Sequence, residues 1–180
     1  KSLKGMPSEE AKGNYIKVVN ELELVDSEPF AFEEKHAAAK EMLDRELDSE
    51  EYEEIKALWK AHSIAEDKRD IEGLMATLTE DCRYEIPQMG KIYENKEGAT
   101  QFYHDLLGAF PDIDFRLLQI YIGPQGVVEE AKVKATHEKD WLVIPASGQE
   151  IEFEVAIFFP WDSKEKRFKG ERVYFKDRKS

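Results

Sequence analysis

The spacing of apolar residues changes once along this 180-residue chain, and that change constrains the fold more than any other feature. From about residue 50 to about residue 110, apolar side chains recur at steps of three and four, as along one face of an α-helix. From about residue 113 they alternate with polar ones, which is typical of a strand with one buried face. Helices followed by a run of strands indicate an α+β fold. We therefore predict that helices cover one face of a bent antiparallel sheet.

Capping and turn residues divide these two regions into elements. Asp48 or Ser49, followed by Glu51 and Glu53, has the pattern of a helix N-cap, and Asp70 caps a second, shorter helix. Pro87 closes a short strand, and GPQG at 123–126 is a turn. The predicted helices cover 31–47, 48–70, 70–82 and 95–110, and the predicted strands cover 82–87, 113–123, 127–139, 149–161 and 171–176.

The first fifty residues differ from the rest in being rich in Glu, Lys and Ala. The stretch FEEKHAAAKEMLDREL follows Pro29 and has helical apolar spacing, so it predicts a helix of its own. We expect residues 1–49 to form an N-terminal helical extension. Residues 50–180 are expected to form the α+β domain.

Charge and cysteine content limit the partners and the compartment. The formal net charge is −13, and nucleic acid or an anionic membrane surface would require a basic face, so neither partner is expected. An apolar run of membrane-spanning length is absent from the sequence, and the start KSLKGMPSEE lacks the apolar core of a secretory signal. The single cysteine, Cys82, cannot form an internal disulfide, which fits a reducing compartment. We expect a cytoplasmic protein.

A histidine at the end of an alternating strand is the first candidate site residue. His137 has the same parity as Val133 and Ala135, so it is expected to face the helix-covered side of the sheet. Its strand breaks soon afterwards in a loop with Pro145, and the open end of a curled sheet often leaves a cavity. The alternative is a buried histidine with a single hydrogen-bond partner and no chemical role.

Three segments in this order resemble the SnoaL-like polyketide cyclases, members of the wider nuclear-transport-factor-two-like superfamily. They are AFPD at 109–112, ATHEKDWLVIPASGQEIEF at 135–153 and GERVYF at 170–175, and the resemblance spans about residues 50–176. It implies a cone-shaped curved antiparallel sheet wrapped around the N-terminal helices, a deep apolar pocket, and homodimers formed through the sheet. The central family motif is matched at Thr136, His137, Ile144, Pro145, Ser147 and Gly148, while Lys139, Val143 and Ala146 depart from it.

The last strand departs further from the family pattern. Members close with a Tyr-Phe-Asp segment whose aspartate acts as acid and base in aldol ring closure. Here Tyr174 and Phe175 match, Lys176 stands at the aspartate position, and Asp177 follows one place later. One step along a strand moves a side chain to the opposite face. A lysine kept out of water can act as a base, but an exposed Lys176 is the simpler interpretation.

The implied chemistry needs a base beside a carbonyl group and a donor for the enolate. His137 is the candidate catalytic residue, because an unperturbed histidine titrates near neutral pH. His62 lies on the apolar stripe of its helix together with Trp59; the alternative is a histidine at the edge of the core. The candidate pocket residues are His62, Trp59, Tyr84, Trp141, Tyr174 and Lys176.

The function predicted from these residues is that of a SnoaL-like cavity protein for an apolar small molecule. As an enzyme it would be a polyketide cyclase or a related isomerase or lyase that abstracts a proton next to a carbonyl group. No cofactor or metal is expected, because the chain lacks a Gly-rich nucleotide motif and a cluster of Cys and His. The alternative is a non-catalytic binding module for an apolar ligand on the same scaffold.

Overall fold

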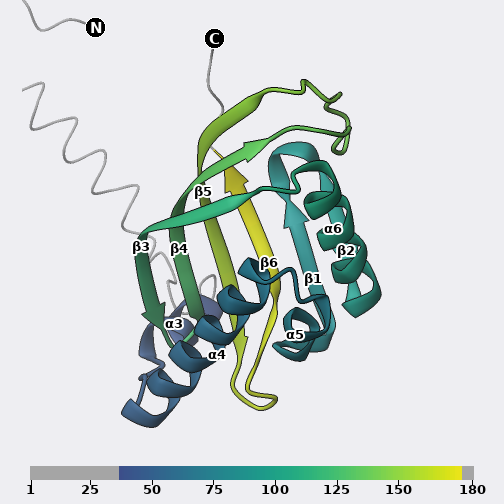
Figure 1. Ribbon diagram of the computed structural model, residues 1–180. Helices are drawn as coiled ribbons and strands as arrows, with labels where there is room; N and C mark the ends of the chain where they lie inside the picture. Colours follow the sequence, from purple (N-terminus) through teal and green to yellow (C-terminus); the bar gives the residue numbers. More distant parts are fainter. Residues whose placement is uncertain (1–36, 176–180) are drawn as a thin grey trace, which may run out of the picture. The chain divides into compact units, whose positions relative to one another are not determined.

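The computed structural model describes residues 37–175, and the chain divides into two units, 1–45 and 46–180, which are treated separately (Figure 1). In the first unit, helix α3 (Ala37–Asp44) is the described part of the helix predicted over 31–47. The rest of this extension before Ala37 lies outside the described residues. The proposed boundary between residues 49 and 50 stays a prediction.

The second unit has the α+β architecture predicted from the sequence. Figure 1 shows a curved open sheet with the helices on one of its faces. The strand order is β2-β1-β6-β5-β4-β3. In chain order the elements are α4 (Ser49–Asp67), α5 (Ile71–Ala76), β1 (Leu78–Ile86), η1 (Pro87–Met89), β2 (Lys91–Glu94), α6 (Asn95–Ala109), β3 (Asp114–Gly123), β4 (Gly126–Thr136), β5 (Glu150–Asp162) and β6 (Arg167–Phe175).

The helices begin where the capping residues indicate. The Asp48 carboxylate accepts a hydrogen bond from the Glu51 backbone N–H at 2.8 Å, which caps α4. Asp70 does the same for the Gly73 N–H at 2.9 Å and caps α5. The predicted helix over 70–82 was too long, because Leu78 already pairs with Phe168 in the sheet. The first strand is correspondingly longer than predicted.

The sheet is mixed, although a fully antiparallel sheet was predicted. Strands β1 and β6 run parallel, and the other neighbouring pairs are antiparallel. The chain returns from β5 to lay β6 beside β1, which is its first strand. Alternation of short apolar stretches does not distinguish the two directions of pairing.

The core lies between the helices and the concave face of the sheet. On β4 the side chains of Val127, Ala131, Val133 and Ala135 are buried, as their parity predicts. Strand β5 contributes Val155, Ile157, Phe159 and Trp161 from the same face. No helix within residues 37–175 combines the length and the apolar character that crossing a membrane requires.

A glycine in β6 determines which residues of this strand face the core. Phe168 and Glu171 are both buried, although strict alternation would place them on opposite faces. Between them, Gly170 has φ +108°, and a Cβ atom there would overlap the Arg83 carbonyl oxygen. The register against β1 also shifts at this point. This irregularity turns Glu171 toward the helices.

Candidate functional site

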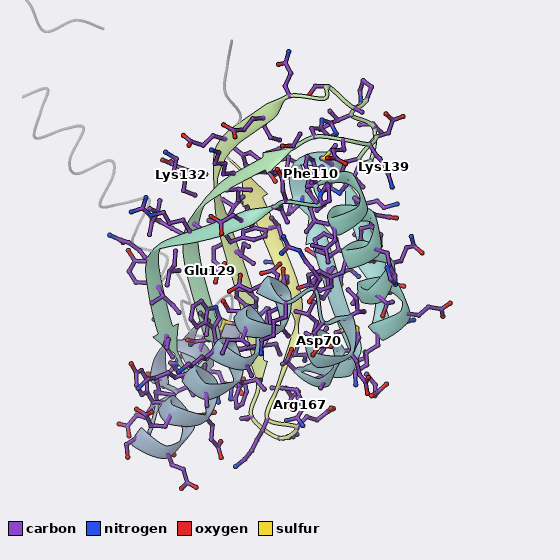
Figure 2. All side chains as sticks on the ribbon, in the orientation of Figure 1. Asp70, Phe110, Glu129, Lys132, Lys139 and Arg167 are labelled. Carbon is purple, nitrogen blue, oxygen red and sulfur yellow. The ribbon has the colours of Figure 1, made fainter. Side chains whose placement is uncertain are left out.

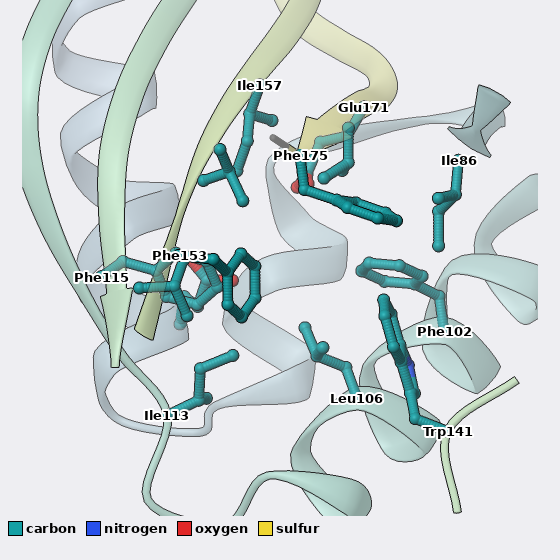
Figure 3. A pocket seen from close by; sticks show the side chains of 14 residues that line it. Ile86, Phe102, Leu106, Ile113, Phe115, Trp141, Phe153, Ile157, Glu171 and Phe175 are labelled. Carbon is teal, nitrogen blue, oxygen red and sulfur yellow. The ribbon is translucent and has the colours of Figure 1, made fainter. Parts of the chain in front are cut away.

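Two small adjoining cavities lie between the helices and the concave face of the sheet. The first is apolar: all but two of its 14 lining residues are hydrophobic, and the exceptions are Glu66 and Glu171. Figure 3 shows Phe102, Phe153, Phe175 and Trp141 around it, with Glu171 descending from β6. Water centres can occupy about 40 Å³ of this cavity, so its ligand is small or enlarges it on entry.

The second cavity is more polar and shares Glu66 and Phe115 with the first. It lies between α4 and strands β3, β4 and β5, and water centres can occupy about 30 Å³ of it. Its wall includes Trp59, His62 and Glu129. The Trp59 indole N–H donates to the Glu129 carboxylate at 2.8 Å. A single apolar ligand could therefore meet carboxyl groups from two directions.

A network of buried hydrogen bonds holds the Glu171 carboxylate. The Tyr103 hydroxyl donates to Glu171 Oε1 at 2.6 Å, and His62 Nε2 lies 3.0 Å from the same oxygen. His62 Nε2 is also 3.0 Å from the Tyr103 hydroxyl, and the Tyr84 hydroxyl lies 3.2 Å from that group. All four side chains are buried, and Glu171 is 5% exposed. The network brings residues from α4, β1, α6 and β6 to one carboxylate.

Burial and mutual repulsion alter the acidity of the groups around the cavities. Burial, followed by the nearby charges of Glu171 and Glu129, raises the pKa of Glu66 well above its usual value. Burial also raises the pKa of Glu129 to about 7, although the Trp59 hydrogen bond acts in the opposite direction. For Tyr84 and Tyr103, burial is again the largest cause of a pKa raised well above the usual value. The site therefore contains a carboxyl, Glu129, that titrates near neutral pH.

His137 is buried as its parity predicts, but it is not among the residues that line either cavity. Its ring stacks on Phe110, with 4.7 Å between ring centres. Its backbone N–H donates to the Gln149 carbonyl, and its carbonyl accepts from the Gly148 N–H. Within the described residues, Nε2 is buried without a hydrogen-bond partner. The catalytic role of His137 stays a prediction.

The other candidates are distributed among three places. His62 and Tyr84 belong to the buried network, Trp59 and His62 line the second cavity, and Trp141 lines the first. Tyr174 packs its ring against that of Phe158, with 5.6 Å between ring centres, and borders a groove. It lines neither of the two cavities. In register, Tyr174 pairs with Ala156, so it faces away from the core. Lys176 lies outside the described residues.

The sequence reasoning missed the acidic half of the site, namely Glu66, Glu129 and Glu171, and also Tyr103. Three of these had a signal. Glu129 has the same parity as Val127 and Ala131, and Glu66 follows His62 by four positions, on the same helix face. Glu171 has the same parity as Val173 and Phe175, which line the first cavity with it. Tyr103 lies on the apolar stripe of its helix and looked like core.

The curved sheet of this α+β domain, with helices covering one face, is that of the nuclear-transport-factor-two-like fold. Residues 55–166, more than half of the chain, match the SnoaL-like domain, so the chain belongs to that family and the predicted resemblance is confirmed. No curated protein matches the chain in sequence.

Solved structures agree with this assignment at the level of the fold. A protein from Jannaschia sp. CCS1, provisionally classed as a SnoaL-like polyketide cyclase, is 17% identical, with a TM-score of 0.60 over 73% of this chain and 90% of that one. A provisionally classed polyketide cyclase from Xanthomonas campestris pv. campestris is 18% identical, with a TM-score of 0.60 over 70% and 93%. TerC, co-crystallised with polyporic acid, is 12% identical, with a TM-score of 0.56 over 68% and 92%. At these identities the similarity concerns the fold alone.

Proposed function

We propose that the protein is a cofactor-independent acid–base enzyme that abstracts a proton next to a carbonyl group of an apolar small molecule. The observation that carries this proposal is the Glu171 carboxylate, which shares with Glu66 a cavity whose other lining residues are hydrophobic, and which is held by Tyr103 and His62. A carboxylate in apolar surroundings, fixed through one oxygen, is suited to act as a general base. TerC, which has the same fold, was co-crystallised with a small molecule.

In this proposal Glu171 takes a proton from the carbon beside the carbonyl group, and an enolate forms. Glu66 lines the same cavity, and its raised pKa lets it supply a proton to the enolate oxygen. Return of a proton to another carbon gives an isomer. Attack of the enolate carbon on a second carbonyl group of the same molecule closes a ring. We assign the base to Glu171 and not to His137, because Glu171 borders the cavity.

Hydrogen–deuterium exchange tests the first step without knowledge of the product. A panel of small cyclic 1,3-diketones is incubated with the protein in heavy water, and loss of the proton between the carbonyl groups is followed by NMR. We expect at least one compound to exchange faster with the protein. Glu171→Gln should lower that exchange by about 100-fold or more, since a positioned base contributes about 10²–10⁴-fold. Glu72→Gln, an exposed carboxylate on α5, is the matched control.

The alternative, a binding module for an apolar ligand, is favoured by the apolar character of the first cavity. It predicts that compounds bind without accelerated exchange. It also predicts that Glu171→Gln binds them at least as well, because the substitution removes a charge from an apolar wall. Exchange catalysed by the wild type and lost in Glu171→Gln would exclude this alternative. Absence of exchange across the panel would contradict the enzyme.

We also propose a homodimer formed through the outer face of the sheet. Leu118 and Tyr121 on β3 are about half exposed there, and Phe158 on β5 is partly exposed beside Tyr174. Water centres can occupy about 310 Å³ of a groove bordered by Leu118, Ala156 and Tyr174. An apolar patch on an outer sheet face is typical of an interface between copies. A monomeric mass in light scattering would contradict the dimer.

The cytoplasm is the proposed compartment, since Cys82 is a free, buried thiol.

A further inference from the structure

We propose that Thr77 is a positioning residue: its hydroxyl keeps a proton on His62 Nδ1, so that the His62–Glu171 pair holds one proton more than a neutral imidazole beside a carboxylate would. Thr77 follows α5 directly and is 4% exposed. The positions of these protons are a property of the free protein. Only their consequence for turnover rests on the proposed function.

The first proton is located by counting donors around Thr77. Its Oγ1 lies 2.7 Å from the Leu74 carbonyl oxygen and 2.6 Å from His62 Nδ1. A threonine hydroxyl has one proton to donate, and a carbonyl oxygen has none. Two oxygens 2.7 Å apart need a hydrogen between them, so the Thr77 proton points at Leu74. Oγ1 is then an acceptor toward Nδ1, and Nδ1 must be an N–H.

The second proton follows from a triangle of atoms on the other side of the ring. His62 Nε2, the Tyr103 hydroxyl and Glu171 Oε1 are separated by 3.0, 3.0 and 2.6 Å. Tyr103 supplies one proton, which the short contact to Glu171 takes. The contact between Nε2 and Oε1 then needs a proton of its own, because two facing lone pairs would repel in this buried site.

Two descriptions satisfy this count, namely an imidazolium beside a carboxylate and an imidazole beside a carboxylic acid, and they differ only in the position of one shared proton. In both, Oε1 of Glu171 is occupied. Oε2 is left to meet a ligand. Thr77 thus determines how many protons the His62–Glu171 pair holds, although it touches only His62.

The competing arrangement turns the Thr77 proton toward His62 and removes the proton from Nδ1. Thr77 would donate to a bare Nδ1, and a neutral His62 would donate from Nε2 to Glu171. That arrangement leaves the two oxygens of Thr77 and Leu74 in contact without a hydrogen, and it holds one proton fewer. The two arrangements therefore differ in an observable way, namely whether Nδ1 carries hydrogen.

The experiment is a ¹H–¹⁵N spectrum of the histidine side chains in the full-length, ¹⁵N-labelled protein near neutral pH. The His62 signals are assigned by their loss in His62→Gln. We expect wild-type Nδ1 to resonate as a protonated nitrogen. Thr77→Val keeps the shape but removes the acceptor, so Nδ1 should shift to the position of a bare nitrogen. Thr77→Ser should retain the wild-type pattern. A bare Nδ1 in the wild type, or an unchanged Nδ1 in folded Thr77→Val, would overturn the inference.

The same variants separate this inference from the proposed function. With an exchanging diketone, Thr77→Val should change the exchange rate by about tenfold or more, because the His62–Glu171 pair loses one proton, and Thr77→Ser should restore most of the wild-type rate. A protonated Nδ1 without exchange in the wild type supports the role of Thr77 and refutes the enzyme. If the wild type accelerates exchange but its Nδ1 is bare, the enzyme is supported and the role of Thr77 is refuted. If Thr77→Val does not fold, the wild-type spectrum alone decides.

Discussion

Replacing Glu129 by glutamine should stabilise the protein, and increasingly so as the pH rises. Glu129 is 7% exposed on the inner face of β4, and burial is the main reason that its pKa is raised from 4.5 to about 7. Between these two values the folded chain keeps a proton that the unfolded chain has lost. Stability therefore falls as the pH rises through this window, and above about pH 7 the full cost is present.

The size of the effect follows from the difference between the two pKa values. The difference is about 2.5, that is 7 minus 4.5, and each unit corresponds to about 1.36 kcal/mol, which gives about 3 kcal/mol when rounded to a whole number. Glutamine keeps an oxygen that can accept from the Trp59 indole, so the 2.8 Å hydrogen bond is retained. Glu66 and Glu171 also lose a repelling neighbour in this variant, which acts in the same direction.

The measurement is urea unfolding followed by circular dichroism, from about pH 5 to about pH 8. We expect Glu129→Gln to equal the wild type near the acidic end and to exceed it by about 3 kcal/mol near the alkaline end. Glu130→Gln changes the same charge on the exposed face of the same strand and should show no such trend. A difference that does not vary with pH, or a variant that becomes less stable than the wild type at high pH, would refute this account of Glu129.

Two further substitutions test other parts of the structure. Gly170→Ala should destabilise the protein by about 3 kcal/mol in urea unfolding, because the new Cβ atom would overlap the Arg83 carbonyl oxygen at a positive φ. Gly108→Ala on α6 meets no neighbour and should be neutral or stabilising by up to about 1 kcal/mol, which makes it the control. His137→Phe keeps a ring against Phe110 and should leave diketone exchange within about twofold of the wild type. A loss of about tenfold or more would return the catalytic role to His137.

The fold could be predicted from the sequence to the extent that each element carries its own period. The burial of Val133, Ala135 and His137 followed from parity, and Asp48 and Asp70 cap helices as expected. The residues of one strand carry no local signal of which other strand it will pair with. For that reason the parallel contact of β1 with β6 and the short strand β2 were not predicted.

The site was predictable only in part, for a related physical reason. His62 and Tyr84 could be selected because their neighbours at helical or strand spacing are apolar. A glutamate on a strand of a chain with net charge −13 is normally a solvated residue, so Glu129 was passed over despite its parity. Glu171 was passed over for the same reason, although it shares the parity of Val173 and Phe175, and its partners His62 and Tyr103 lie 109 and 68 residues earlier in the chain. Only the three-dimensional structure joins these residues.

The position of β6 has a consequence for how the protein is made. This strand, Arg167–Phe175, is the last of the described strands to be synthesised, yet it lies between β1 and β5 inside the sheet. Figure 2 draws the side chains on the ribbon and labels Arg167, where the strand begins. A nascent chain that ends before Arg167 can form the β3-β4-β5 meander. It cannot join that meander to β1 and β2, so the edges of both halves stay unpaired on the ribosome. Final closure of the sheet and delivery of the Glu171 carboxylate to its cavity are therefore the same late event of biosynthesis.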